Sequence, residues 1–349
     1  MGTIATTATS AVGQDDDATD WRLRPDEHAR RLPSEAGALK RVLERPELNA
    51  IIERFQLADA HALKAQRRYK RIGRLGLYAA SIATAVGALF LMPLEHWLRG
   101  PVAVSASAAQ MLGLAAAFFA SRLLAMGKPF DKWMKNRAEA EIARISLFDF
   151  VIDAAEEARA GEMALLPLQL EYFRRYQLDV QQRYYQGRGS EHAAAVWRNN
   201  RLLGASVIVT LASIALGLVA ALHVAAAWQL PIPTQLHALS TNLAGPQTNR
   251  LLLGLGVIAS ALYGLGVARS LMDLDERNAS RYLTTAANLA YLSEERLPAA
   301  REAADRGSVQ DVRAFVNSVH ALVSSEHQDW ILLSGRERDP QRLRRAGQA

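Results

Sequence analysis

The chain has 349 residues, a net charge of +6 and no cysteine, and half of its residues are hydrophobic. The absence of cysteine excludes disulfides, thiolate zinc sites and cysteine nucleophiles. Four stretches without Asp, Glu, Lys or Arg interrupt an otherwise charge-rich sequence, and they exclude most classes of soluble enzyme.

The amino-terminal residues 1–33 are small, polar and charged, with three consecutive acids at Asp15, Asp16 and Asp17. Such a composition predicts a disordered segment. A helix is expected to begin near Ser34, and residues 48–75 are expected to form one long helix that leads into the membrane.

The four uncharged stretches are each long enough to cross a bilayer, which takes about 20 apolar residues. We expect transmembrane helices at about 75–94, 101–124, 202–228 and 251–272. Because short loops join the first two and the last two, the sequence predicts two transmembrane hairpins.

The segments between and after the hairpins predict long cytoplasmic helices. These lie at about 130–158, which Gly161 ends, at 168–186, which Gly187 and Gly189 end, and at 273–292 and 308–330. A basic tail covers 331–349. The predicted fold class is therefore an all-α polytopic membrane protein, with one unit at 34–160 and a second, similar unit at 161–330.

Basic residues flank the apolar stretches, whereas the two short loops carry few charges. Lys- and Arg-rich flanks stay in the cytoplasm, so both termini and the central region are expected there, at the inner membrane of a bacterium. The same flanks favour anionic lipid head groups. Nucleic-acid binding is the rival explanation of the charge, but the topology already accounts for where the charges lie.

No motif in the sequence predicts catalysis, a metal or a cofactor. The run Gly254-Leu255-Gly256 lies inside an apolar stretch with no strand before it, so it is no dinucleotide fingerprint. Gly256, Ser260 and Gly264 instead form a small-residue face suited to close helix packing. His320 and His327 lack the spacing of metal ligands and are expected on a solvated helix surface.

Arg122 and Arg269 each sit at the inner end of the second helix of a hairpin. Two interpretations remain open: the side chains snorkel to lipid head groups, or they ring the inner mouth of a pore formed by a homo-oligomer. The four stretches contain no acid, which argues against a proton- or cation-coupled transporter.

Residues around the hairpins resemble the SLATT group, the two-transmembrane effector domains associated with nucleotide-signalling defence modules. Three stretches carry the resemblance, namely the helix before the first hairpin, the helix after it and the helix before the second. The matching residues are Asp59, Gln66 and Tyr69; Trp133, Arg137 and Glu141; and Tyr172, Asp179, Gln181, Tyr184 and Tyr185.

The resemblance implies a tandem of two SLATT-like domains and a membrane effector without enzymatic activity that forms pores or perturbs the membrane. A separate cytoplasmic nucleotide sensor, encoded nearby, is the implied activating partner. The alternative is a non-conducting, membrane-anchored scaffold that recruits a soluble enzyme.

Overall fold

The structure is a computed structural model that describes residues 8, 12, 23–227, 246–273 and 275–336. These residues form helices joined by turns and by one longer connection at 154–164, and they include no strand. They divide into two compact units, each built from separate parts of the chain. We call Arg67–Pro129 with His192–Glu276 the membrane unit, and Met1–Gln66, Phe130–Glu191 and Arg277–Ala349 the bundle unit.

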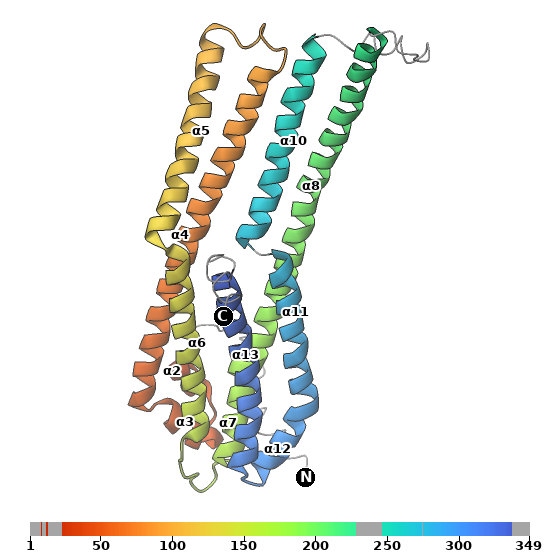
Figure 1. Ribbon diagram of the computed structural model, residues 1–349. Helices are drawn as coiled ribbons and strands as arrows, with labels where there is room; N and C mark the ends of the chain where they lie inside the picture. The colour runs from red at the N-terminus through yellow and green to blue at the C-terminus, as the bar shows by residue number, and fades with distance from the viewer. Residues whose placement is uncertain (1–7, 9–11, 13–22, 228–245, 274, 337–349) are drawn as a thin grey trace, which may run out of the picture. The chain divides into compact units, whose positions relative to one another are not determined.

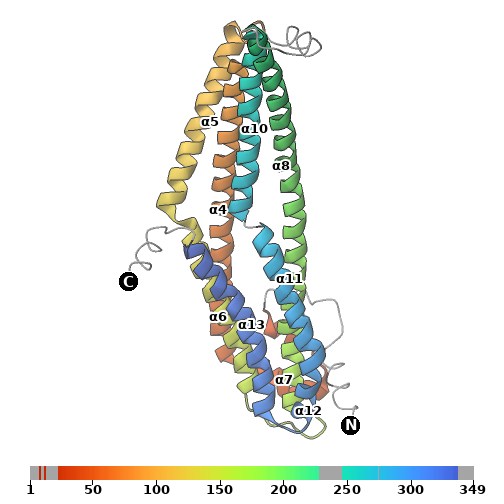
Figure 2. The ribbon, with the colours of Figure 1, turned by 45° about the vertical axis from the view of Figure 1, so that its right-hand side comes forward.

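The membrane unit contains α5 (Gly100–Gly127), α10 (Pro246–Asp273) and the carboxyl-terminal parts of α4 (Pro46–Leu91) and α8 (Val180–Ala227). Helices α4 and α5 form the first hairpin, and α8 and α10 lie side by side (Figures 1 and 2). Glycines allow close approach: a Cβ atom at Gly113 of α5 would lie 2.9 Å from the carbonyl oxygen of Ala79 in α4, and one at Gly266 of α10 would lie 2.9 Å from Leu203 in α8.

Three of the described helices are long and apolar enough to cross a membrane: α4, α5 and Arg250–Ser270 within α10. They correspond to the stretches predicted at 75–94, 101–124 and 251–272. The stretch predicted at 202–228 lies in α8 up to Ala227, and its last residue, Trp228, is outside the described residues, as is the predicted loop up to 245. The all-α membrane fold is thus confirmed.

The apolar side chains of the membrane unit point outward. In α5, Val104 and Leu112 are 70 and 71% exposed, and in α8 Ile208 is 69% exposed. A soluble protein rarely exposes so large an apolar surface. Helices that keep their backbone hydrogen bonds internal and their apolar side chains outside are what a bilayer requires.

The bundle unit has a hydrophobic core of Leu, Val, Ala and aromatic side chains. Besides the amino-terminal parts of α4 and α8, it contains the short helices α2 (Pro25–Arg31), η1 (Ser34–Ala36) and α3 (Gly37–Leu43), and the longer α6 (Pro129–Asp153), α7 (Leu165–Phe173), α11 (Asp275–Tyr291), α12 (Leu297–Asp305) and α13 (Val309–Arg336). Helix α7 packs against α3, α12 and α13. Two π-helical turns, η2 (Arg174–Asp179) and η3 (Leu292–Arg296), continue α7 into α8 and α11 into α12.

Helix α2 lies inside the segment predicted to be disordered, so that expectation does not hold for these residues. Pro25 stands at the start of the helix, Asp26 and Glu27 in its first turn and Arg30 near its end, an order that suits the helix dipole. Its His28 is only 3% exposed. Tertiary packing therefore overrides the polar composition.

The predicted break at Gly187 and Gly189 is wrong, because α8 runs through both glycines. A Cβ atom at Gly189 would lie 2.8 Å from Leu283 of α11, whereas one at Gly187 would meet nothing within 4 Å. Gly189 therefore admits a neighbouring helix. The predicted units at 34–160 and 161–330 are continuous in the chain, whereas each of the two compact units combines parts of both. The tandem repeat stays a prediction.

Candidate functional site: a buried polar network in the bundle unit

A network of polar side chains joins α4, α6 and α8 inside the bundle unit, and Arg137 of α6 is its central cation. Its guanidinium lies 3.6 Å from the carboxylate of Asp59 in α4 and 3.1 Å from Glu141, one turn further along α6. Glu141 is buried, at 7% exposure. One cation thus faces two carboxylates that sequence analysis placed in the family pattern.

Arg144, one turn beyond, is completely buried. Its Nε donates a hydrogen bond of 2.7 Å to Oε1 of Gln177, and Nη2 donates one of 3.2 Å to the carbonyl oxygen of Tyr176. These bonds tie α6 to η2. Gln181, at the start of α8, is also completely buried, and its amide oxygen and nitrogen have no hydrogen-bond partner among the described residues. Such an amide is costly to bury.

Aromatic rings complete the network on α8. The guanidinium of Arg137 lies 5.9 Å from the ring centroid of Tyr184, and that of Arg188 lies 5.8 Å from it. Tyr185 is buried and packs at 5.6 Å on Tyr282 of α11. Cation–π contacts of this kind strengthen as the groups lose water, so the cluster connects α6, α8 and α11.

Burial and the attraction of opposite charges act in opposite directions on the pKa values of Arg137 and Asp59. Burial raises the pKa of Asp59 above its ordinary value, because the charged form loses water, while Arg137 opposes that shift. Burial would lower the pKa of Arg137, but Glu141, Tyr184, Tyr185 and Asp59 together hold that pKa above its ordinary range. Arg137 therefore stays charged and opposes the effect of burial on Asp59.

A second ion-pair cluster links α7 to α12. Glu171 is 2% exposed and accepts hydrogen bonds of 2.7 Å from Arg174 and from Arg301. Arg174 also pairs with Asp179 at 2.6 Å. Burial raises the pKa of Asp179, and Arg174 opposes the shift. Asp179 therefore belongs to this cluster and not to the network around Arg137.

Tyr172 belongs to an aromatic core and not to either charged cluster. It is 1% exposed, and its hydroxyl lies 3.0 Å from Nδ1 of His28. His28 stacks on Tyr176 with ring centroids 3.7 Å apart, and Phe148 lies at 6.1 Å from Tyr172. The stacking of His28 on Tyr176 fixes α2 against η2.

The other predicted residues lie elsewhere. Gln66 and Tyr69 are half-buried on α4, and Trp133 stands near the start of α6, where its ring meets Phe130 at 5.8 Å. The structure thus brings five of the family residues into the network: Asp59, Arg137, Glu141, Tyr184 and Tyr185. Gln181 is buried at the start of α8 and makes no hydrogen bond to them.

In the membrane unit, Arg122 is exposed near the end of α5 and Arg269 is half-buried near the end of α10. A Cβ atom at Gly256 or at Gly264 would meet nothing within 4 Å, whereas Ser260 donates a hydrogen bond to the carbonyl oxygen of Gly256. Their predicted roles at a pore mouth and in helix packing stay predictions.

Sequence reasoning missed Gln177, Tyr282 and Arg301. A glutamine and a tyrosine on charge-rich helices carry no signal of burial, and Arg301 pairs with a residue far away in the chain. The spacing Glu171-x-x-Arg174 was the one available signal, because side chains three apart meet on a helix.

The described residues contain no cluster of His, Asp and Glu able to hold a metal ion. His320, expected on a solvated surface, is instead 6% exposed and lies 3.2 Å from the carboxylate of Asp149 and at 5.4 Å from the ring of Phe173. His327 lies in α13, but nothing further is described of its side chain.

Residues 53–156 match the family model described as SMODS and SLOG-associating 2TM effector domain 3, a SLATT family. This range contains the first hairpin with Asp59, Arg137, Glu141 and Arg144, and it confirms the resemblance there. Neither a curated protein nor a solved structure matches the chain. The match indicates a membrane effector of a defence or conflict system.

Proposed function

Because residues 53–156 match a SLATT effector domain, we propose that this protein is a bacterial inner-membrane effector that permeabilises the membrane when a cytoplasmic partner activates it. The observation that carries the proposal is that the match spans both a membrane hairpin and the charged residues Asp59, Arg137 and Glu141. A receiver and an output element are thus encoded in one short stretch.

Continuous helices support a coupling between the two. Helix α4 carries Asp59 and runs without a break to Leu91, and α8 carries Gln181, Tyr184 and Tyr185 and runs without a break to Ala227. A helix is stiff along its axis, since every turn is hydrogen-bonded to the next. A partner that alters the packing around Arg137 would therefore displace helices that also cross the membrane.

A conducting path would need several copies. The hydroxyl groups of Ser81, Thr84, Thr210 and Ser213 each donate to a carbonyl oxygen of their own helix, and the apolar side chains face outward. One copy therefore offers lipid an apolar surface. The proposed pore is therefore a homo-oligomer, in which hydroxyls on adjacent copies would line the path.

Topology provides an independent check of the inner-membrane placement. Lys- and Arg-rich flanks predict cytoplasmic termini and a cytoplasmic central region. Reporters fused at residues 30, 165 and 345 should report cytoplasm, and those at 97 and 240 should report the outside. An external signal at 165 would contradict the two-hairpin topology.

The membrane potential of cells tests the function itself. We expect that expression with the proposed nucleotide-sensing partner depolarises the membrane within minutes, as a potential-sensitive dye reports, and that either protein alone does not. A stable membrane potential in cells that contain the inserted protein bound to its partner would contradict pore formation. That result would favour the non-conducting scaffold, which binds a partner without conducting ions.

A further inference from the structure

Helix α8 carries a stacked pair of side chains on the surface of the membrane unit. The guanidinium of Arg201 lies 3.8 Å from the ring centroid of Trp197, one turn earlier on the helix. Trp197 is 57% exposed, and Arg201 is exposed as well. We call this pair the Trp197–Arg201 stack. Its exposure makes it accessible to a molecule outside the protein.

A hydrogen bond between α8 and α10 determines which way the stack faces. Asn199 is 4% exposed, and its Nδ2 donates to the carbonyl oxygen of Gly266 in α10 at 3.0 Å. Trp197 and Arg201 are each two residues from Asn199, so they lie on nearly the opposite side of the helix. Ile208, two turns beyond Arg201 on that side, is 69% exposed. The stack therefore faces away from α10, in line with an apolar side chain that suits lipid.

The same hydrogen bond gives the depth of the stack in a bilayer. Gly266 lies one turn before Ser270, the last residue of the apolar span Arg250–Ser270 in α10. Because Asn199 contacts Gly266, the stack lies level with the end of this span. Lipid head groups lie at that level, and Trp rings are enriched there because they are amphipathic. The stack is thus placed to meet a head group.

The stack leaves the hydrogen-bond donors of Arg201 available. A guanidinium stacks on a ring through its face, whereas its five N–H donors lie in its plane. Arg198 is exposed three residues away, and side chains at this spacing are neighbours on a helix. Within the described part of the chain, no carboxylate pairs with Arg198 or Arg201. The preceding acid in the sequence, Glu191, pairs with Arg188.

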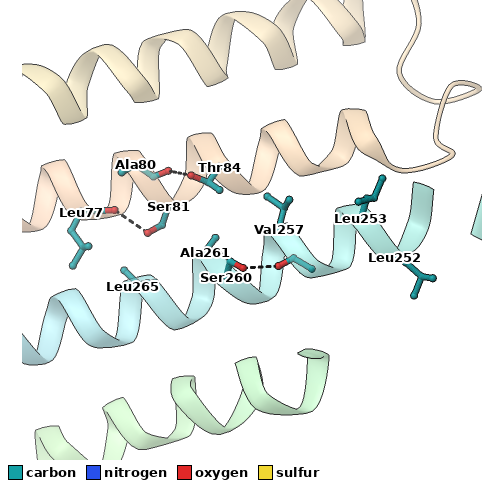
Figure 3. Close-up of a pocket in the computed structure, with 12 residues that line it drawn as sticks. Leu77, Ala80, Ser81, Thr84, Leu252, Leu253, Val257, Ser260, Ala261 and Leu265 are labelled. Carbon is teal, nitrogen blue, oxygen red and sulfur yellow. Dashed lines mark hydrogen bonds between the residues drawn. The ribbon is translucent and has the colours of Figure 1, made fainter. Parts of the chain in front are cut away.

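A groove between α4 and α10 in the same unit lacks such donors. Its three hydroxyl groups, those of Ser81, Thr84 and Ser260, each donate to a carbonyl oxygen of their own helix (Figure 3). The other residues that line it are aliphatic or glycine. The groove therefore offers no charged group to a lipid phosphate, whereas the surface of α8 does.

We propose that the Trp197–Arg201 stack, together with Arg198, binds the phosphate of an anionic phospholipid. The ring holds the guanidinium in one orientation, which prepares Arg201 to donate two parallel hydrogen bonds to the phosphate oxygens. The second positive charge, on Arg198, favours a lipid with a net negative charge over a zwitterionic one. The proposal requires that the protein lies in a membrane, but not that it conducts ions.

The test is native mass spectrometry of the full-length protein in detergent, as phosphatidylglycerol or phosphatidylcholine is added. We expect Arg201→Gln to raise the apparent Kd for phosphatidylglycerol about fivefold, the effect of one basic residue near an anionic surface, and to leave that for phosphatidylcholine almost unchanged. The matched control is Arg71→Gln, which removes an exposed guanidinium on α4 that stacks on no described ring. An equal loss in this control would overturn the proposal, because general surface charge would then be responsible.

Two further variants separate the stack from charge alone. Arg201→Lys keeps the charge but loses the planar guanidinium, and Trp197→Leu keeps both charges but loses the ring. We expect each to raise the apparent Kd for phosphatidylglycerol about threefold, since that is the effect of an exposed cation–π contact. Helix content by circular dichroism should stay unchanged, because both side chains are exposed. Wild-type affinity in both variants would overturn the proposal, even if Arg201→Gln weakens binding.

Discussion

At the scale of single residues, Arg137 is the cation that neutralises two carboxylates. Asp59 and Glu141 would face each other without it, and Glu141 is almost fully buried. We expect Arg137→Met to lower the free energy of unfolding by about 2–3 kcal/mol, at the low end for a broken buried pair because Arg137 keeps some exposure. Chemical unfolding in mild detergent measures this change.

The pH dependence of the same variant identifies the cause. Without Arg137 the pKa of Asp59 rises further, so the folded state binds protons more readily than the unfolded one and gains stability as the pH falls. The cost of Arg137→Met should therefore shrink between pH 7 and about 4, and adding Glu141→Gln should restore part of it. Arg306→Met, at an exposed pair with Glu302, serves as the control and should change stability by less than about 0.5 kcal/mol. A loss independent of pH would mean that packing and not charge is responsible.

A cluster of ion pairs at the surface gives the opposite pH dependence of stability. Arg41 of α3 binds Glu162 and Glu156 at 2.9 Å in the segment that connects α6 to α7. Hydrogen bonds from Arg41 and from the backbone N–H of Arg159 lower the pKa of Glu162 to about 2. Because this folded pKa is depressed, the stabilisation is fully present above the ordinary value of 4.5 and is lost as the pH falls towards 2.

We expect the melting temperature of Arg41→Gln to lie below that of the wild type at pH 6, and the two to converge near pH 2. Circular dichroism in detergent follows both curves. Lys40→Gln, at an exposed neighbouring residue, should match the wild type at every pH. A difference for Arg41→Gln that stays constant down to pH 2 would show that Glu162 is not its source.

At the scale of elements, two glycines in α8 give a matched pair. Gly189→Ala would place a Cβ atom 2.8 Å from the side chain of Leu283 and 3.2 Å from its backbone nitrogen, so α8 and α11 must separate, at a cost of about 1–2 kcal/mol. Gly187→Ala meets nothing and should stabilise the helix by about 0.5–1 kcal/mol. Equilibrium unfolding measures both, and changes of equal sign would contradict the close approach of α11.

The helix ends that carry Arg122 and Arg269 bear on the pore proposal. If these arginines ring the inner mouth of an oligomer, Arg122→Glu/Arg269→Glu reverses the local field, and rings of charge set ion selectivity. The preference for anions over cations should then fall or invert, as reversal potentials under a salt gradient report. An unshifted reversal potential would place both side chains among lipid head groups.

The sequence predicts those elements whose signal is local, and it misses those that depend on tertiary contacts. The membrane helices were predictable because twenty uncharged apolar residues have few other environments, and α4, α5 and α10 match within a few residues. Helix α2 and the unbroken α8 were not predictable, because burial of His28 and the approach of Leu283 to Gly189 are tertiary contacts. Likewise, the spacing of Arg137 and Glu141 predicts their ion pair, whereas no spacing in the sequence predicts the contacts of Gln177 and Arg301.

At the scale of the whole molecule, the same two helices take part in both compact units. Helices α4 and α8 each contribute to both compact units, and the two units alternate along the chain. The helix segments of one unit are therefore covalently continuous with segments of the other. Under the proposed function, this continuity would carry a binding event in the bundle unit to the membrane unit.

Planar-bilayer recording of the purified full-length protein with the proposed nucleotide-sensing partner tests the central claim most directly. We expect discrete conductance steps that begin only after the activated partner is added. Arg137→Met should make these steps less frequent without changing their size if, as proposed, the network controls opening and does not line the path. A bilayer that stays silent, or one that leaks gradually without steps, would contradict an activated pore.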